Sequence, residues 1–353
     1  MTRHLPAPRR LERLNDAALE QGASYARIAA TATAFPKELV SNDQIVERYG
    51  HTVSASVMAR ITGVTQRCVA GPGVADSDLL FEASRACLAK AGLAVDDLSK
   101  LLVTKFLGDR ALPMTAAMLQ KKLGCSVAFQ AYDIDGGIHT FITAFHSAAN
   151  LMAIGDGPIL IASGGVINRV VSRKDPRVAF QYGDGAAAVL LMPSERPHLL
   201  ASYSFNNPDF LRLAVGFSIR RDVPADIHET KDYERLFSLY DQGDWKPAQQ
   251  FVLDAMQHTS KALLGAADRH WNQVDLVLIT ETQQRLWQAI VSHFGIETHR
   301  TVSLLSKYGN TMSAMLPMQL DEALRTGRVG PGCLVMMLSV GEGLSGGGVL
   351  IEC

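Results

Sequence analysis

The sequence predicts an α/β fold built from two similar halves. Apolar runs typical of buried strands alternate along the chain with helical patterns. The strand-like runs also recur at a constant spacing. The run ending at Thr104 resembles the run ending at Thr280, and the run ending at Ser163 resembles the run ending at Ser339 at the same offset in the sequence. We therefore expect a duplicated fold whose strands are buried on both faces of each sheet.

The predicted elements follow the same order in both halves. A helical pattern over 81–93 leads into the first repeated strand, and a helical pattern over 251–264 leads into its counterpart. Each half closes with a glycine-rich turn and an apolar strand, at 182–192 and at 343–352. Because ligand sites in such folds gather where strands end and helices begin, we expect the site at those loops.

Three segments follow from this organisation. Residues 1–22 are rich in arginine and lack an apolar core, so they are expected to form an N-terminal extension outside the core fold rather than a secretory signal. Residues 23–195 are expected to form the N-terminal half and residues 196–353 the C-terminal half. The length of 353 residues fits two domains of ordinary size.

Composition excludes several classes of protein. Hydrophobic residues make up 47% and charged residues 20% of the chain, which favours a large buried core. The net charge of −1 gives no attraction to nucleic acid or to an anionic membrane surface, and no apolar run is long enough for a membrane span. The five cysteines are scattered and form no C-x-x-C pair, so neither a disulfide framework nor a metal site is expected. A cytoplasmic location fits this cysteine pattern.

Four segments together resemble the β-ketoacyl-acyl-carrier-protein synthase III (KAS III) family of condensing enzymes. They are Y-G-N-T-M-S-A with the following helix (308–332), Y-G-D-G-A-A-A-V-L-L (182–191), R-I-T-G-V-T-Q-R (60–67) and A-Y-D-I-D-G-G-I-H-T-F (131–141). The resemblance extends from about residue 26 to the C-terminus. It implies a thiolase-like duplicated α/β fold with five layers, αβαβα. It also implies a site built from Cys, His and Asn that handles acyl thioesters.

The sequence departs from the family pattern at the nucleophile. Alignment of the 131–141 segment places Ile138 where the family has its cysteine, and isoleucine has no atom that can hold an acyl group. A shift of the register by one residue would bring His139 to the pocket instead. Successive helical residues point about 100° apart, and the surrounding D-I-D-G-G matches without a gap, so Ile138 is the expected occupant.

The second departure replaces the family's histidine by Glu281, in D-L-V-L-I-T-E-T-Q-Q-R-L (275–286). A carboxylate at the end of a buried strand can have a raised pKa and act as a general base or acid. Alternatively, Glu281 is a structural remnant that pairs with Arg285. The sequence leaves both roles open.

The third family residue is retained as Asn310, in Y-G-N-T. Its amide can orient a carbonyl or a water in the pocket, although G-N-T also suits a tight turn. In the C-terminal loop, V-G-E-G-L-S (340–345) resembles the family turn that supplies an oxyanion-binding N–H. Ile138, Gly341, Glu342 and Gly343 are therefore predicted to line the substrate site, with Glu281 and Asn310 as the candidate catalytic residues.

Other residues bear on the ligand. Val57 and Met58 stand where the family commonly has a tryptophan that stacks on coenzyme A, which predicts weaker binding of that ligand. A basic group is a candidate for phosphate or carrier-protein contact, namely Arg60, Arg67, Arg169, Arg173 and Arg177. Phe106, Leu107 and 205–217 are candidate tunnel-lining residues. None of the cysteines is expected to replace the missing nucleophile.

Two functions follow from the resemblance. The chain is expected to be an acyl-thioester-binding protein of fatty-acid or polyketide-type biosynthesis that performs cysteine-independent acyl transfer or condensation. Alternatively, it is a non-catalytic partner subunit of an active condensing enzyme. The expected partners are an acyl-coenzyme A or acyl-carrier-protein thioester and a second condensing-enzyme subunit, in a homodimer or heterodimer. No cofactor is expected, and neither nucleic acid nor a membrane is an expected partner.

Overall fold

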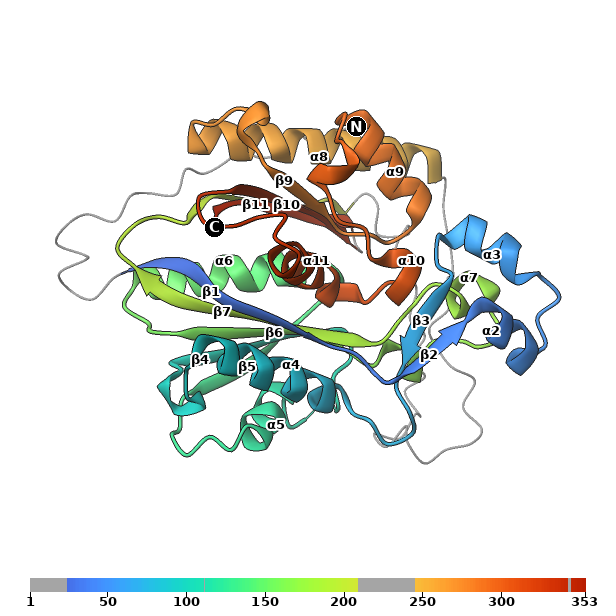
Figure 1. Cartoon of the computed structure of the whole chain (residues 1–353), viewed down its shortest axis with the longest axis horizontal. Helices are drawn as coiled ribbons and strands as arrows, with labels where there is room; N and C mark the ends of the chain where they lie inside the picture. The colour runs from blue at the N-terminus through green and yellow to red at the C-terminus, as the bar shows by residue number, and fades with distance from the viewer. Residues whose placement is uncertain (1–23, 111, 209–244, 342–343) are drawn as a thin grey trace.

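Two β-sheets lie face to face with helices between them (Figure 1). The computed structural model describes residues 24–110, 112–208, 245–341 and 344–353. The first sheet has five strands in the order β1-β7-β6-β4-β5. Their bounds are β1 Tyr25–Ala34, β4 Lys100–Lys105, β5 Gln130–Asp135, β6 Ile159–Gly165 and β7 Gly185–Ser194. The second sheet has four strands in the order β8-β11-β10-β9, namely β8 Leu199–Asn206, β9 Leu276–Ile279, β10 Leu334–Gly341 and β11 Ser345–Glu352.

The two sheets repeat the same strand arrangement. In the first sheet, β4 and β6 are parallel and Thr104 lies opposite Ser163, while β6 and β1 both pair antiparallel with β7. In the second sheet, β9 and β10 are parallel, and β10 and β8 both pair antiparallel with β11. The strands matched by the constant spacing therefore occupy equivalent places, which confirms the predicted α/β class. The boundary drawn at 195/196 falls between β7 and β8, and the division into two domains stays a prediction.

Helices form three layers around the sheets, as Figure 1 shows. Helices α6 (Thr140–Ala153) and α11 (Met315–Arg325) lie between the sheets, where Phe141 and Leu320 pack in one core with Val189 of β7 and Val335 of β10. Helices α4 (Asp76–Ala91) and α5 (Thr115–Lys122) cover the outer face of the first sheet. Helices α8 (Trp245–Ala267) and α9 (Gln284–His293) cover the outer face of the second. The resulting order of layers is αβαβα.

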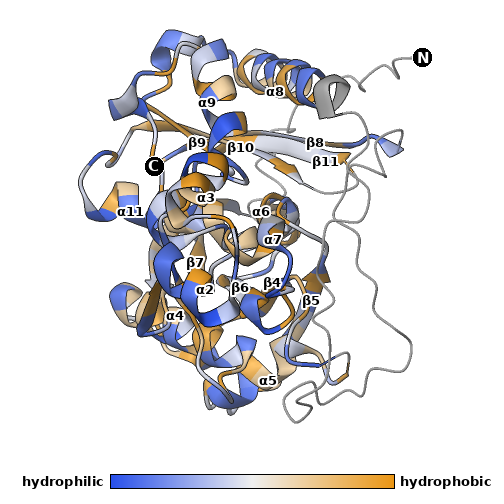
Figure 2. Cartoon of the chain, turned by 90° about the vertical axis from the view of Figure 1, so that its right-hand side faces the viewer, coloured by the Kyte–Doolittle hydropathy of each residue, from blue (hydrophilic) through white to orange (hydrophobic). Residues whose placement is uncertain are grey.

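The remaining elements form a smaller unit beside the layers. A two-stranded sheet of β2 (Glu38–Ser41) and β3 (Gln66–Val69) lies near the short helices α2 (Asn42–Tyr49), α3 (Ala55–Thr62), α7 (Pro176–Ala179) and α10 (Leu305–Tyr308). Helices of the outer layers carry hydrophilic and hydrophobic residues side by side (Figure 2), as expected when one helix face packs on a sheet. No helix in the described part of the chain is long and apolar enough to cross a membrane.

Candidate functional site

Loops from both halves meet beside the start of α6. Tyr182, in the loop before β7, forms a bridge with Asn310, in the loop before α11. The N–H of Asn310 donates to the carbonyl of Gln181 at 2.8 Å, and the N–H of Gly183 donates to the carbonyl of Asn310 at 3.1 Å. A Cβ atom at Gly183 would clash with the carbonyl of Tyr308, so this crossing requires glycine. The crossing fixes the loop of Asn310 against the first half.

Ile138 is the residue predicted to stand at the nucleophile position. It lies between the end of β5 and the start of α6, where Gly136 makes the turn with a φ of 148°. Its side chain is buried in an apolar cluster with Ile167, Met312 and other residues, namely Val170, Val171, Val178 and Tyr182. An aliphatic side chain thus occupies the start of the helix, where a thiol would gain acidity from the helix N-terminus.

The end of β10 approaches the same turn. A Cβ atom built on Gly341 would lie 3.2 Å from the backbone nitrogen of His139 and 3.5 Å from the Cβ of Ile138. Gly341 therefore lies directly beside Ile138, in agreement with the expectation that these residues share a site. Glu342 and Gly343, the other two residues predicted in this loop, lie outside the described residues.

Glu281 is buried at the end of β9, with 1% of its surface exposed. Its Oε2 accepts hydrogen bonds from the N–H groups of Leu304 at 2.6 Å and Leu305 at 3.0 Å. The side-chain amide of Gln319 lies 3.4 Å from the same oxygen. Burial raises the pKa of Glu281, and hydrogen bonds to the carboxylate oppose this shift. The carboxylate thus holds the start of α10.

The expected pairing of Glu281 with Arg285 is wrong in this structure. Arg285 is exposed on α9, and no ion pair joins the two side chains within the described ranges. Glu281 lies before the first residue of α9, Gln284, so the two residues do not share a helix face. The partners of the carboxylate are the backbone N–H groups of α10 and the side chains of Ser303 and Gln319, rather than a guanidinium.

Asn310 is fully buried and has one hydrogen-bonding group left over. Its Oδ1 accepts the N–H of Met312 at 2.9 Å, which fits the positive φ of 56° at Met312. Its Nδ2 has no hydrogen-bond partner among the residues that the structure describes. A buried amide N–H without a partner is costly, so a ligand oxygen or a water would be favoured there.

His139 follows Ile138 and is also buried. Its Nε2 lies 3.3 Å from the hydroxyl oxygen of Ser204 on β8, and its Nδ1 has no partner within the described ranges. Burial lowers the pKa of His139 to about 4, so the ring is neutral at physiological pH. A neutral ring with so low a pKa is a weak general base.

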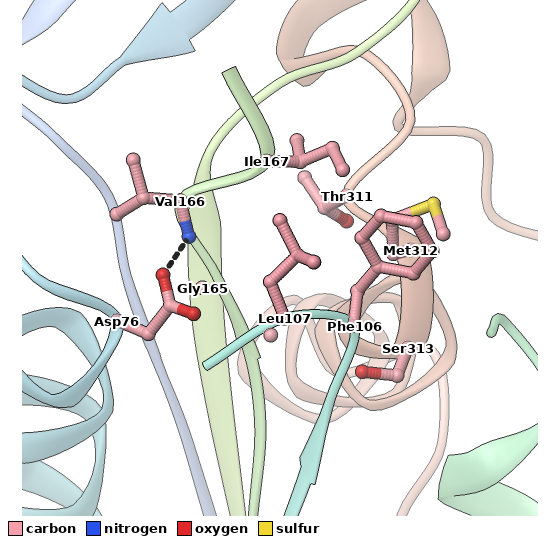
Figure 3. A pocket seen from close by; sticks show the side chains of 10 residues that line it. Asp76, Phe106, Leu107, Gly165, Val166, Ile167, Thr311, Met312 and Ser313 are labelled. Atoms are coloured by element: carbon pink, nitrogen blue, oxygen red, sulfur yellow. Dashed lines mark hydrogen bonds between the residues drawn. The ribbon is translucent and has the colours of Figure 1, made fainter. Parts of the chain in front are cut away.

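A small pocket lies beside these residues (Figure 3). Its walls come from the loop after β4, the end of β6 and the loop before α11, and they include Phe106, Leu107, Ile167, Thr311 and Met312. Its volume of about 10 Å³ suffices for roughly one water molecule. Phe106 and Leu107 line this pocket, and their place in a substrate tunnel stays a prediction; residues 209–217 of the other predicted stretch lie outside the described residues.

The sequence analysis missed two buried polar residues. Asp76, at the start of α4, lines the pocket and accepts the N–H of Val166 at 2.7 Å (Figure 3). It also accepts a hydrogen bond from the guanidinium of Arg169 at 2.5 Å. Burial raises the pKa of Asp76, and Arg169 opposes the shift. Gln319 donates to the carbonyls of Ile279 and Val302. An amide within the apolar run of α11 was the available signal for Gln319.

Three of the five arginines expected to form a phosphate patch donate hydrogen bonds to groups of the protein itself. Arg67 is fully buried and donates to the carbonyls of Val40 and Phe180 and to Asn42. Arg169 pairs with Asp76, and Arg173 donates to Asn168. Arg60 is exposed at the end of α3, and the side chain of Arg177 lies outside the described residues. The expected five-arginine surface is therefore wrong, because Arg67 lies in the interior and Arg169 is paired with Asp76.

No described cysteine offers a substitute nucleophile next to Ile138. Burial raises the pKa of the Cys68 thiol to about 11 and that of Cys87 to about 12, and it also raises the pKa of Cys125 and Cys353. Raised pKa values leave little thiolate at neutral pH. Among the described residues, no group of three or more His, Cys, Asp or Glu side chains is arranged to hold a metal ion.

Comparison with known proteins gives consistent matches. The family model of 3-oxoacyl-[acyl-carrier-protein] synthase III matches residues 132–208, and the model of its C-terminal part matches residues 264–353. The β-ketoacyl-[acyl-carrier-protein] synthase III of Rhodopirellula baltica is 30% identical over 342 residues, which cover 92% of this chain and 98% of that protein. The protein of the same description from Neisseria gonorrhoeae is 27% identical over 329 residues, covering 93% and 99%.

Solved structures give the same fold. The 3-oxoacyl-[acyl-carrier-protein] synthase III of Pseudomonas aeruginosa superposes with a TM-score of 0.82 at 22% identity, covering 93% of this chain and 98% of that one. The synthase III of Aquifex aeolicus gives a TM-score of 0.81 at 22% identity, covering 93% and 100%. OleA of Xanthomonas campestris gives 0.81 at 20% identity, covering 93% and 98%. These likenesses confirm the thiolase-like fold.

Proposed function

The chain belongs to the β-ketoacyl-[acyl-carrier-protein] synthase III family, and we propose that it binds acyl thioesters as a non-condensing subunit beside a cysteine-bearing member of that family. The observation that carries this proposal is the packing of Ile138. The side chain at the start of α6 has no nucleophilic atom and is embedded among aliphatic neighbours. An acyl-enzyme intermediate therefore has no atom to form on at this position.

The surroundings of Glu281 support the same proposal. A general base must reach the proton that it removes, and Oε2 already accepts two backbone N–H groups. Removing that oxygen from its donors would leave buried N–H groups unpaired. Glu281 in this proposal is a structural residue that holds the start of α10, rather than a base.

The edge of the first sheet supports the binding of a partner subunit. Strand β5 is an edge of the five-stranded sheet, and among the described strands it pairs with β4 alone. Unpaired edges are templates for pairing with a second chain. Leu112, in the loop that follows β4, is 81% exposed, and Met114 beside it is also exposed. The unpaired strand edge and these two exposed apolar residues support a homodimer or a heterodimer with a condensing enzyme.

A second candidate function is cysteine-independent acyl transfer, in which a bound thioester is attacked directly by an acceptor. The orphaned Nδ2 of Asn310 favours it, because a buried N–H without a partner can bind a thioester carbonyl. Proximity alone can supply several kcal/mol of barrier reduction. In this case, Asn310 would be a catalytic residue and the ligand would again be an acyl-coenzyme A or acyl-carrier-protein thioester.

A thiol-release assay separates the two candidates. Acetyl-, hexanoyl- and dodecanoyl-coenzyme A and the corresponding acyl-carrier proteins are incubated with the full chain, alone and with a cysteine-bearing KAS III protein from the same organism. We expect the chain alone to release no thiol above background and to alter the rate or chain-length preference of the partner. Release by the chain alone that falls tenfold or more in Asn310→Ala, but not in the exposed control Asn272→Ala, would instead establish the cysteine-independent enzyme.

A cysteine placed at residue 138 tests whether thioesters reach that position. The variant Ile138→Cys is incubated with each thioester, and acylation is followed by intact mass spectrometry. The matched control is Ile154→Cys, because Ile154 is 80% exposed at the end of α6. We expect a covalent acyl adduct on Ile138→Cys and none on Ile154→Cys in the same time. Equal labelling of both, or of neither, would show that residue 138 does not face a thioester site.

A further inference from the structure

Two cysteines lie opposite each other at the far end of the second sheet. Strands β10 and β11 are antiparallel, and their register pairs Leu334 with Glu352. The next residues outward are Cys333 and Cys353. The N–H of Cys353 donates to the carbonyl of Cys333 at 2.9 Å, so the two residues stay neighbours just beyond the last ladder pair, although the N–H of Cys333 turns to the carbonyl of Gly330. Both cysteines are free thiols in this structure.

The two side chains project from the same face of the sheet. Val335 lies two residues after Cys333, and Ile351 lies two residues before Cys353. Both belong to the core between the sheets, and Cys333 and Cys353 pack against that same core. Alternation along a strand therefore places the two thiols on one side. Both residues are partly exposed, so a small reagent can reach them.

The distances permitted by this pairing match those of a disulfide. Directly opposed residues of antiparallel strands have Cα atoms about 4.5–5.5 Å apart. A disulfide accepts Cα separations of about 4.4–6.8 Å. The backbone contact between the two residues therefore places them in the range in which a disulfide can form. The local backbone is held by the bond from the N–H of Gly332 to the carbonyl of Cys353, at 2.7 Å.

We propose that Cys333 and Cys353 form a redox-active pair that closes to a disulfide by exchange with a low-molecular-weight disulfide such as oxidised glutathione. The thiolate of Cys333 attacks one sulfur of the oxidant, the S–S bond breaks, and one glutathione thiolate leaves. The thiolate of Cys353 then attacks the sulfur of Cys333 and releases the second glutathione. The protein dithiol is oxidised by two electrons, the glutathione disulfide is reduced to two thiols, and the two protein protons pass to the leaving thiolates.

The surroundings suggest the order of attack. The Sγ of Cys333 accepts the N–H of Gly330 at 3.4 Å, so a backbone donor holds this sulfur in place. Burial, and the neighbouring Cys333, raise the pKa of Cys353 to about 11. Cys333 therefore attacks first and Cys353 closes the bond, and closure speeds up as the pH rises. The pair lies at the end of β10 opposite Gly341, so the inference is independent of the thioester site.

Intact mass spectrometry of the full chain after incubation with oxidised glutathione tests the proposal. We expect wild type to lose two hydrogens without retaining glutathione, and peptide mapping to find Cys333 joined to Cys353. We expect Cys353→Ser to retain one glutathione on Cys333. The matched control Cys125→Ser, which removes a partly exposed cysteine elsewhere, should close the bond like wild type.

A stability measurement gives a second readout. The oxidised wild type should melt on the order of 3 °C above the reduced form, because the bond closes a loop that contains both strands. Cys353→Ser should show no such difference between the two conditions. Wild type that keeps glutathione on both cysteines, that remains fully reduced under conditions that oxidise a model dithiol peptide, or that joins another cysteine pair would overturn the proposal.

Discussion

Equivalent strands of the two halves, β4 and β9, end in opposite buried charges. Lys105 follows Thr104 in the first half, and Glu281 follows Thr280 in the second. The Nζ of Lys105 lies 2.8 Å from Asp135 and 3.4 Å from Asp133, both on the neighbouring strand β5. Glu281 has no ammonium or guanidinium at this range within the described residues, and it accepts backbone N–H groups instead.

The difference follows from the sheet topology. In the first sheet β4 has β6 on one side and β5 on the other, and β5 supplies the countercharges. In the second sheet β9 is the edge strand of the four that the structure describes, so no strand on its outer side offers a charged side chain. The start of α10 covers that position and supplies N–H groups. A buried charge is thus compensated by whatever the local topology brings near it.

Removal of the Glu281 carboxylate tests this comparison, and of the changes considered it should lower the free energy of unfolding the most. We expect Glu281→Leu to lower the free energy of unfolding by about 3–5 kcal/mol, because the N–H groups of Leu304 and Leu305 lose their buried acceptor. Urea unfolding at neutral pH, followed by circular dichroism, measures the change. The exposed Glu47→Gln is the matched control and should alter stability by less than about 0.5 kcal/mol. A loss below about 1 kcal/mol for Glu281→Leu would contradict the structural role.

His139 extends the comparison to a buried ring with almost no compensation. Among the described residues, its ring has one hydrogen-bond partner, the hydroxyl of Ser204. The folded pKa of about 4 lies below the ordinary value of 6.5, so the unfolded state binds more protons between these pH values. The resulting stability is fully present above pH 6.5 and is lost as the pH falls toward 4, by about 3 kcal/mol.

The His139→Gln variant isolates this contribution, because glutamine can keep the contact to Ser204 and does not titrate. We expect the stability of wild type relative to His139→Gln to fall between pH 6.5 and pH 4 when both are unfolded in urea. Parallel pH profiles for the two proteins would mean that the ring is protonated equally easily in the folded and unfolded states.

Lys105→Met should be less damaging than Glu281→Leu. Asp135 is largely exposed and Asp133 also accepts the N–H groups of Thr115 and Ala116 at 2.9 and 2.7 Å, so neither carboxylate is left uncompensated. We expect a loss of about 2 kcal/mol in the free energy of unfolding. A loss larger than that of Glu281→Leu, in the same urea experiment, would reverse the ranking of the two strand ends.

The threonines before these charges give the smallest expected effect. The hydroxyl of Thr104 donates to Ser163 at 2.7 Å, whereas that of Thr280 donates to the carbonyl of Leu338 at 3.4 Å. We expect Thr104→Val to cost about 1 kcal/mol and Thr280→Val about half of that, because the longer bond is weaker. Thermal unfolding of the two variants in parallel makes the comparison. A greater cost for Thr280→Val would contradict it.

The fold was predictable because its signal is repeated and long-range. The runs ending at Thr104 and Ser163, and their counterparts ending at Thr280 and Ser339, become parallel strand pairs in the two sheets. Buried parallel strands need continuous apolar residues, which the sequence displays directly. The duplicated α/β class therefore needed no knowledge of side-chain contacts.

The site was less predictable because its partners come from distant loops. The proximity of Gly341 to Ile138 followed from the resemblance. The acceptance of N–H groups by Glu281 did not, because Leu304 and Leu305 lie beyond the whole of α9 in the chain and approach only after α10 docks. The i to i+4 spacing that suggested Arg285 presumed a helix that already includes Glu281, whereas α9 begins at Gln284. The prediction that Arg67 lies on a phosphate-binding surface was wrong for a similar reason. Its buried acceptors, the carbonyls of Val40 and Phe180, come from segments far apart in the sequence.

The backbone bridge between Tyr182 and Asn310 makes the loop of the second half depend on the loop of the first. The loop that holds Asn310 donates one backbone bond to Gln181 and accepts another from Gly183, so residues of the first half set the position of an amide encoded in the second. A side chain at residue 183 would push the loop away, because a Cβ atom there would meet the carbonyl of Tyr308. The two repeats therefore depend on each other at this point, because a change of backbone path at 181–183 in one half moves the amide carried by the other.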